Sequence, residues 1–444
     1  MKYIYSSIIL FLFLLCLLLT AGCKKDEKII ESGTAGELIW TLNEKGTLAI
    51  SGVGKIPDYN SKYDYNVNDY IVDYPWPNTI IAVVIKNGVT SIGNKAFAFC
   101  RDLTSVTIPS SVIDIKQEAF RSCSSLTSIT IPNSVTSINI SFIACLELKS
   151  IVVDKGNTAF ISEEGVLFNK AKTTLIQYPA GKTGAYTIPN SVISIGEAAF
   201  WGCSGLTSVT IPNSVTDIEP TAFKECFGLT SVTIPNSVTS IGSRAFEACT
   251  GLISITIPNS VTDIGSSTFD SCFDLTSITI PNSVTDIKAG IFQGCIGLTS
   301  VTIPNSVKSI GNSAFYGCSS LTSVNIPNLV TSIGLTTFAD CSSLTSVIIP
   351  NSVTSIGSSA FTRCSNLTSV TIGNSVTTIG NQAFYYCTSL TEVINKSDTP
   401  QEIMMETFYT MDNLSPITLR VPAASLDAYR AAPVWKDFGN IVAI

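Results

Sequence analysis

Cysteines recur at a fixed spacing along most of the chain, and this spacing constrains the fold more than any other feature of the sequence. After Cys16 and Cys23, they stand at positions 100, 123, 145, 203, 226, 249, 272, 295, 318, 341, 364 and 387. The gaps are 23, 22 and 58 residues, followed by eight gaps of 23. The gap of 58 residues equals one repeat plus an insertion of 35 residues. A period of this length indicates twelve stacked structural repeats.

Every repeat carries the same apolar pattern, of which Leu344–Cys364, with the sequence LTSVIIPNSVTSIGSSAFTRC, is an example. Alternating apolar residues in its first third predict a strand that ends at Pro350, because proline has no N–H to donate to a sheet. Val353–Ile356 predicts a second short strand, and Gly357 predicts a change of direction. Ser358–Cys364 is short and suits one helical turn. One such coil buries too little apolar surface to fold alone, so a stable fold requires that coils stack on one another.

The pattern LxxVxIPxxVxxIGxxAFxxC, which spans Val89–Leu390, resembles the BspA-type leucine-rich repeats of bacterial surface proteins. The resemblance implies a mainly β fold with short helical turns. Its architecture would be a right-handed leucine-rich-repeat solenoid of about twelve 23-residue coils with N- and C-terminal caps. An ordinary leucine-rich repeat has Asn or Cys where this sequence has Ser352, which predicts a variant coil geometry.

The domain boundaries follow from the ends of the repeats. We expect an N-terminal β cap at 37–88, the solenoid at 89–391 and a C-terminal cap at 392–444. The insertion, at about 149–183, is interpreted as a β-hairpin that projects from one coil. Five tyrosines between residues 59 and 76 either pack within the N-terminal cap or form a recognition surface: Tyr59, Tyr63, Tyr65, Tyr70 and Tyr74.

The first residues are typical of an export signal. A basic start precedes twelve apolar residues, Ile8–Leu19, which are too few to span a bilayer as a helix. The following Thr20–Cys23 resembles the lipobox of bacterial lipoproteins. We therefore expect residues 1–22 to be a signal peptide, Cys23 to be lipidated, and residues 23–36 to form the lipidated N-terminus and linker. The charged residues 24–28 resemble a tag for the outer surface of the outer membrane, and a solvated spacer is the alternative.

The repeat cysteines form a single column and lack the paired spacing of metal sites. The cysteines recur in step with the apolar core residues of each repeat, which favours free buried thiols. Cysteines of adjacent coils could nevertheless come close enough to form disulfides. The sequence therefore predicts no metal and no cofactor.

The chain contains no histidine, which excludes His-dependent nucleophilic catalysis and His-ligated metals. Asp217, Asp263 and Asp286 recur at one coil position, but a column of carboxylates along a solenoid has no cleft around it. We therefore expect no enzymatic activity. A net charge of −7 argues against nucleic acid as a partner.

Large apolar residues appear at two variable positions, just after the repeat phenylalanine and just after the repeat cysteine. Aromatic side chains dominate the energetic centres of protein interfaces, so these residues are candidate partner-binding positions, and packing between coils is the alternative. The candidates are Trp201, Phe227, Phe273, Tyr316, Tyr385 and Tyr386.

The resemblance implies a surface-exposed, lipid-anchored binding protein or adhesin. It would recognise proteins or glycans of a host or a neighbouring cell through its solenoid, and it would be held at the outer membrane by its lipid. An envelope scaffold or glycan-capture lipoprotein is the alternative. The residues themselves support a long rigid scaffold whose many weak sites act together.

Overall fold

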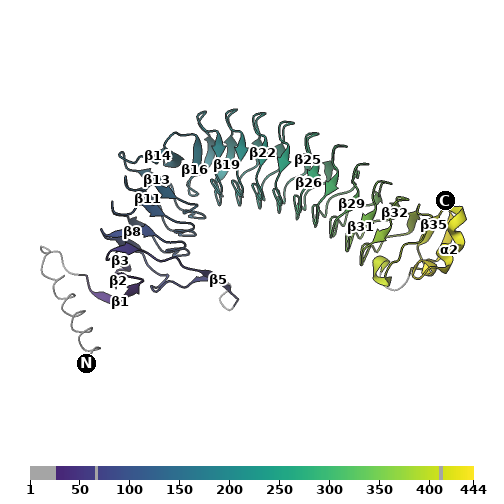
Figure 1. Ribbon diagram of the computed structural model, residues 1–444, viewed down its shortest axis with the longest axis horizontal. Helices are drawn as coiled ribbons and strands as arrows, with labels where there is room; N and C mark the ends of the chain where they lie inside the picture. Colours follow the sequence, from purple (N-terminus) through teal and green to yellow (C-terminus); the bar gives the residue numbers. More distant parts are fainter. Residues whose placement is uncertain (1–26, 66–68, 410–413) are drawn as a thin grey trace, which may run out of the picture.

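The computed structural model describes residues 27–65, 69–409 and 414–444, which form an elongated, arch-shaped β-solenoid (Figure 1). The predicted signal peptide and Cys23 lie outside these residues. Among the described helices, none has the length and apolar character needed to cross a membrane. The fold is mainly β with short helical turns, and it has about 16 turns rather than twelve. The number is larger because both caps add strands to the ends of the repeat sheets.

Nearly every coil contributes one strand to a first parallel ladder, which we call the long-strand face, although the coil that begins at Leu321 has no regular strand there. Inward and outward residues alternate in the long-strand face, so that Val232 is buried between the exposed Ser231 and Thr233. Successive coils pair in register, as Val232 does with Ile255. The strands of this face are β9 (Ser105–Thr107), β11 (Ser128–Ile131), β13 (Ser150–Val153), β17 (Gly184–Thr187), β19 (Leu206–Thr210), β21 (Ser231–Thr233), β23 (Ser254–Thr256), β25 (Ser277–Thr279), β27 (Ser300–Thr302), β30 (Ser346–Ile348), β32 (Ser369–Ile372) and β34 (Glu392–Asn395).

A second parallel ladder, the short-strand face, follows the proline turn of each coil. Its strands are mostly two residues long, and the isoleucine of each pair points into the core, as Ile241 does. They are β8 (Val89–Ile92), β10 (Asp114–Ile115), β12 (Ser137–Ile138), β18 (Ser194–Ile195), β20 (Asp217–Ile218), β22 (Ser240–Ile241), β24 (Asp263–Ile264), β26 (Asp286–Ile287), β28 (Ser309–Ile310), β29 (Ser332–Ile333), β31 (Ser355–Ile356) and β33 (Thr378–Ile379).

The segment between the glycine and the cysteine of each coil forms a run of tight turns, which we call the turn face, instead of the expected helical turn. Two positions per coil are left-handed, with φ of +55° at Ser359 and +59° at Arg363 in one example. The N–H groups of Ser359, Phe361 and Arg363 donate to carbonyl oxygens of the next coil at 2.9, 2.7 and 2.7 Å. In a helix these N–H groups would donate to carbonyl oxygens of the same coil. Here they donate to the next coil instead and form a third hydrogen-bonded ladder between coils.

The glycine column marks a close approach between neighbouring coils. Gly357 does not have a positive φ, but a Cβ atom there would lie 2.6 Å from the carbonyl carbon of Gly334 in the preceding coil. Glycine is therefore favoured where two coil backbones approach closely, and not because the turn requires its conformational freedom.

The repeat phenylalanines stack face to face through the core. Ring centroids of successive coils are 4.7 Å apart for Phe200 and Phe223 and 5.7 Å apart for Phe246 and Phe269. Trp76 continues the stack at the N-terminal end, at 5.5 Å from Phe97. The column thus provides much of the apolar burial that a single coil lacks.

The twelve repeat cysteines are buried free thiols, with no disulfide among the described residues. A typical thiol donates to the phenylalanine carbonyl of the preceding coil, as Cys249 Sγ does to Phe223 O at 3.1 Å. Burial away from water disfavours the thiolate and raises the pKa of Cys100 to about 12.

The insertion does not project from the solenoid as expected, because its strands form part of the core. β14 (Phe160–Glu163), β15 (Val166–Asn169) and β16 (Thr174–Gln177) are antiparallel neighbours, and β16 then pairs in parallel with β18. Leu167 packs in the N-terminal core, while Val166 and Phe168 pack in the C-terminal core. The insertion is thus a wall between two core segments, and the arch bends there (Figure 1).

The N-terminal cap extends the long-strand sheet with antiparallel strands. β1 (Ile29–Ala35), β2 (Leu38–Asn43) and β3 (Thr47–Ser51) are consecutive neighbours, and β3 pairs in parallel with β7 (Ala82–Ile85), which pairs with β9. β4 (Gly54–Lys55) pairs with β8, and β5 (Ser61–Asp64) with β6 (Asp69–Val72) forms a separate hairpin.

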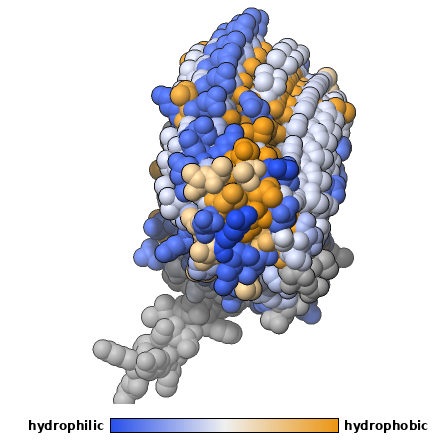
Figure 2. Space-filling view, turned by 90° about the vertical axis from the view of Figure 1, so that its right-hand side faces the viewer, coloured by the Kyte–Doolittle hydropathy of each residue, from blue (hydrophilic) through white to orange (hydrophobic). Residues whose placement is uncertain are grey.

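The C-terminal cap continues the same face with parallel strands β35 (Thr418–Val421) and β36 (Asn440–Ala443). Its helical turns are η1 (Met405–Phe408), η2 (Ala423–Ser425), α2 (Leu426–Ala431) and η3 (Trp435–Asp437). The buried Trp435 closes the core, and Arg430 of α2 donates to the Ile441 carbonyl of the last strand at 3.2 Å. Figure 2 looks onto this end, with straight rows of side chains of similar hydropathy running back along the solenoid.

The buried thiol column predicts how the cysteines react. Native protein at pH 8 should leave the twelve repeat cysteines unmodified by a soluble thiol reagent, because all twelve thiols are buried away from solvent. In denaturant without reductant, all twelve should react. Fewer than twelve reactive repeat thiols would show that disulfides form, and mass spectrometry of the labelled peptides would locate them.

The phenylalanine stack predicts a large loss of stability on truncation. Phe246→Ala should lower the free energy of unfolding by about 3–5 kcal/mol, because it removes a fully buried ring from the stack. The matched control Phe227→Ala removes an exposed ring outside the stack. It should lower the free energy of unfolding by less than about 1 kcal/mol. Urea unfolding followed by circular dichroism measures both, and equal losses would contradict the stacking role.

Candidate functional site: exposed aromatic residues around the arch

The turn face lies on the concave side of the arch. Hairpin β5–β6 reaches the inner side of the arch in Figure 1, and its Tyr70 stacks on Phe99 of the turn face with centroids 5.3 Å apart. Arg121, from the N-terminal side of the bend, lies 5.7 Å from the Phe99 ring and 5.5 Å from the Trp201 ring, which belongs to the coil after the insertion. Turn-face side chains therefore connect coils on both sides of the bend.

Trp201, a predicted partner-binding residue, is half-buried in this intramolecular network. The Lys224 ammonium lies 4.8 Å from its ring centroid, opposite the contact with Arg121. The two cations are held in turn by carboxylates, Arg121 by Glu118 at 3.0 Å and Lys224 by Glu247 at 3.0 Å. Packing between coils, the alternative that the sequence left open, therefore involves much of the surface of the Trp201 side chain.

Tyr316, Tyr385 and Tyr386 lie farther along the turn face. Tyr385 contacts Tyr386 edge to face with centroids 4.5 Å apart, and Tyr409 of the C-terminal cap stacks on Tyr385 at 5.7 Å. Toward the middle of the arch, the Asp340 carboxylate raises the pKa of Tyr316.

Arg363 also lies on this part of the turn face, with Nη1 at 4.0 Å from Asp340 Oδ1 and with a largely exposed side chain. The result is a strip rich in Tyr with one Arg, the residue types that dominate protein interfaces. Sequence comparison of the coils found the three repeat tyrosines but not Tyr409, because the cap lies outside the repeat pattern.

Phe227 and Phe273 do not lie on the turn face. They follow the repeat cysteines at the border of the long-strand face, where Ile253 and Ile296 are also exposed. We call these four residues the apolar edge. Ile253 was missed at the level of sequence, although it is the one isoleucine in a column that otherwise holds mostly threonine.

The tyrosines of the N-terminal cap divide between the two roles that the sequence left open. Tyr59 and Tyr74 pack around Trp76, with centroids at 5.6 and 5.7 Å, and burial raises the pKa of Tyr59 to about 12. Tyr63, Tyr65 and Tyr70 are exposed on or beside hairpin β5–β6. The first group packs the cap, and the second enlarges the aromatic surface of the concave side.

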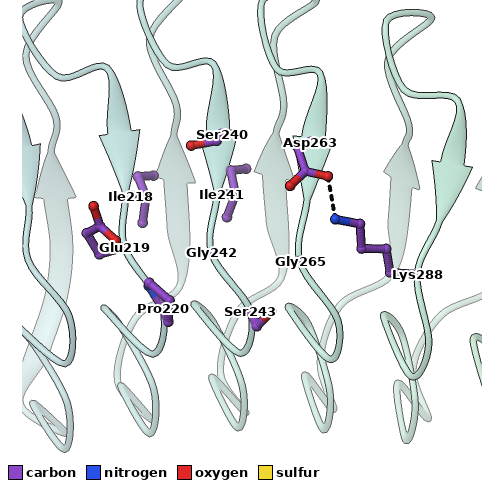
Figure 3. A pocket seen from close by; sticks show the side chains of 10 residues that line it. All are labelled: Ile218, Glu219, Pro220, Ser240, Ile241, Gly242, Ser243, Asp263, Gly265 and Lys288. Atoms are coloured by element: carbon purple, nitrogen blue, oxygen red, sulfur yellow. Dashed lines mark ion pairs between the residues drawn. The ribbon is translucent and has the colours of Figure 1, made fainter.

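Of the three candidate aspartates on the short-strand face, Asp263 lines a shallow hollow. The hollow has a volume of about 240 Å³ and lies over Gly242 and Gly265, whose lack of side chains leaves the space (Figure 3). Asp263 pairs there with Lys288 at 2.5 Å.

The other two carboxylates of this column are also bound by neighbours. Asp217 accepts a hydrogen bond from Ser240 at 2.7 Å. The hydroxyls of Ser309 and Thr285 lower the pKa of Asp286, so this group is ionised near neutral pH, unlike a general acid. Within the part of the chain that the structure describes, no group of three or more Asp, Glu, Cys or His residues could hold a metal ion.

A wider furrow borders the long-strand face at its proline turns. Its volume is about 570 Å³, and uncharged residues line it, among them Thr210, Thr233, Asn213, Asn236 and Pro235. It has hydroxyl and amide groups for hydrogen bonding but no acid or base.

These features define a class of protein: a leucine-rich-repeat solenoid with an invariant core and aromatic residues at selected surface positions. The chain belongs to the family described as BspA type Leucine rich repeat region (6 copies), which matches residues 74–183, 178–299 and 285–415. No curated protein matches the chain.

Several solved structures are similar to this chain. A leucine-rich repeat protein from Eubacterium ventriosum is 26% identical with a TM-score of 0.52, and the match covers 76% of this chain and 95% of that one. A leucine-rich repeat protein from Bacteroides ovatus is 27% identical with a TM-score of 0.48, covering 84% and 94%. A leucine rich cell surface protein from Faecalibacterium prausnitzii is 27% identical with a TM-score of 0.46, covering 87% and 99%.

The network around Trp201 predicts a structural effect of its removal. Trp201→Ala should lower the free energy of unfolding by about 1–2 kcal/mol, because it removes two cation–π contacts, one with Arg121 across the bend and one with Lys224 of the next coil. Tyr65→Ala, which removes a ring that is 88% exposed, is the control and should leave stability unchanged. Thermal melting compares the variants, and a Trp201→Ala protein as stable as the wild type would contradict the role of this network.

Proposed function

We propose that this protein is a surface-exposed, lipid-anchored binding protein or adhesin that recognises proteins or glycans of a host or a neighbouring cell, without catalysis. The observation that carries the proposal is the contrast between an unvarying coil and the exposed aromatic residues confined to a few coils. The coil needs its phenylalanine, cysteine and leucine columns for stability. It does not need Tyr316, Tyr385 or Tyr386 on the surface, and exposed tyrosines favour contact with a partner.

Membership of the BspA-type family supports a binding role for the solenoid. Its length supports avidity, because contacts that are weak singly become strong when several coils engage one partner. The lack of histidine, the ion-paired Asp263 and the ionised Asp286 support the absence of catalysis.

The lipid anchor would place the N-terminal cap close to the membrane. Five residues lie between Cys23 and Ile29, where β1 begins, and the six steps along the chain can span at most about 20 Å. The remainder of the arch would then extend away from the membrane, with the tyrosines of the C-terminal half farthest from the anchor.

An envelope scaffold or a glycan-capture lipoprotein is the second candidate. The uncharged furrow and the hydroxyl-rich long-strand face favour its glycan form, because they offer hydrogen bonds without a charge that would select an ionic partner.

Orientation at the cell envelope is the first test. Protease treatment of intact cells should remove the repeat region while a periplasmic marker protein stays intact, and immunoblotting with antibodies against the solenoid detects both results. Repeats that survive on intact cells and are cleaved only after lysis would overturn surface exposure and favour the envelope-scaffold role.

The tyrosine strip is the second test. If it contacts a protein partner, Tyr385→Ala/Tyr386→Ala should weaken binding to the extracellular-matrix glycoproteins that the wild type binds by at least about tenfold. Tyr65→Ala, at the other end of the concave side, is the matched control. Binding assays on immobilised glycoproteins measure the effect, and unchanged binding by the double variant would exclude the strip as the contact.

A further inference from the structure

The apolar edge is a group of exposed hydrophobic side chains on four successive coils. Phe227, Phe273 and Ile296 each follow a repeat cysteine, whereas Ile253 follows the repeat leucine of the coil in which Thr250 follows the cysteine. Phe227, Ile253, Phe273 and Ile296 are 47%, 51%, 41% and 48% exposed, although each could be a small polar residue without harm to the core. Most other coils have Ser or Thr at the corresponding positions. A cluster of exposed apolar residues on a protein surface indicates a contact site rather than a requirement of folding.

The stacking of the coils holds these residues in two neighbouring columns, one with Phe227, Thr250, Phe273 and Ile296 and the other with Thr230, Ile253 and Thr276. The Ile253 N–H donates to Thr230 O at 3.0 Å, the Thr276 N–H donates to Ile253 O at 3.3 Å, and the Gly297 N–H donates to Phe273 O at 2.9 Å. Phe227 and Phe273 are two coils apart, which places them about 10 Å from each other along the solenoid at about 4.8 Å per coil. The spacing is therefore set by the backbone and not by the side chains.

A row of serine hydroxyls runs beside the apolar edge. Ser231, Ser254, Ser277 and Ser300 are the first outward residues of β21, β23, β25 and β27, and all four are exposed. These hydroxyls make no hydrogen bond to other residues that the structure describes. They are thus available as donors and acceptors at the same spacing as the apolar residues.

This surface carries almost no charge. The four segments that form it, residues 226–236, 249–259, 272–282 and 295–305, contain a single ionisable side chain other than buried cysteine, that of Asp274. The turn face and the short-strand face of the same region carry ion pairs, such as Lys224–Glu247 and Lys288–Asp263. A surface without charge complements an uncharged partner, because a charged one would lose hydration without gaining a counter-ion.

We propose that the apolar edge and the adjoining serine row bind an uncharged, extended polysaccharide that lies along the solenoid. A pyranose ring has apolar C–H faces and a rim of hydroxyls, which match the phenylalanine rings and the serine row respectively. The separation of Phe227 and Phe273 is close to the length of two sugars in an extended β-linked chain. The proposal rests on the glycan form of the proposed function and names its ligand class and its site.

Binding in solution tests this site independently of where the protein faces. Detergent-purified full-length protein is titrated by calorimetry with soluble mixed-linkage β-glucan, with xyloglucan and, as the charged comparison, with polygalacturonate. We expect binding to at least one of the neutral polymers and none to polygalacturonate. Phe227→Ala/Phe273→Ala should weaken the binding at least tenfold, and Ser254→Lys should weaken it by placing a charge in the serine row.

The matched control is Leu146→Ala, because Leu146 also follows a repeat cysteine and is 49% exposed but stands alone, outside the four coils. It should bind like the wild type, and thermal melting should show that all variants are folded. No binding to either neutral polymer, equal binding to polygalacturonate, or full binding by the double phenylalanine variant would each overturn the proposal.

Two further results separate this site from the adhesin role. Loss of binding to a matrix glycoprotein by the Phe227→Ala/Phe273→Ala variant, with no polysaccharide binding by the wild type, would reassign the edge to a protein partner. Failure of surface exposure in the protease experiment would leave polysaccharide binding in solution unchanged, so the two proposals fail separately.

Discussion

Backbone hydrogen bonding between successive coils is the constraint on which the rest of the structure depends. Both strand faces and the turn face present N–H and carbonyl groups toward the neighbouring coil, so each coil is completed only by the next. This requirement explains the close approach at Gly357, where the coils leave no room for a Cβ atom, and the left-handed residues Ser359 and Arg363, which turn alternate N–H groups outward. The phenylalanine stack and the buried thiols fill the space that these ladders enclose.

One consequence is that exposed residues can vary from coil to coil while the core stays the same. Exposed side chains such as those of Phe227 and Tyr386 lie outside the core, so the residues at these positions can vary without disturbing it. The chain thus has several separate surfaces on one scaffold: an aromatic concave side, an uncharged long-strand face with its apolar edge, and a charged short-strand face. A partner that recognises one of these surfaces is not expected to recognise the others, because their chemistry differs.

Much of the fold was predictable from the repeat pattern, and much of the candidate site was not. The period, the strand before Pro350 and the buried columns of Phe and Cys follow from local sequence, because every repeat has the same apolar pattern and packs against a nearly identical neighbour. The insertion was misjudged because its apolar run Val166–Phe168 looks like an ordinary hairpin strand until both cores that it separates are known. The reason for glycine at Gly357 could not be found within one repeat, because it lies in the neighbouring coil.

The candidate site shows the same division. Variation among the coils identified Trp201, Phe227, Phe273, Tyr316, Tyr385 and Tyr386, but it could not tell that Trp201 lies between Arg121 and Lys224. Arg121 is 80 residues before Trp201 in the chain, and only the bend at the insertion brings the two together. Ile253 lies in the column next to the phenylalanines, and only the stacking of the coils brings the two columns onto one surface.

The sequence by itself determined the repeat length, the inward columns and the residues that depart from the consensus, because these depend on the fit of each coil to an identical neighbour. The tertiary structure alone decided which departures share a surface, that the turns face the inside of the arch, and that the insertion forms an internal wall. These properties depend on the curvature of the stack and on contacts between distant coils. No single repeat contains that information.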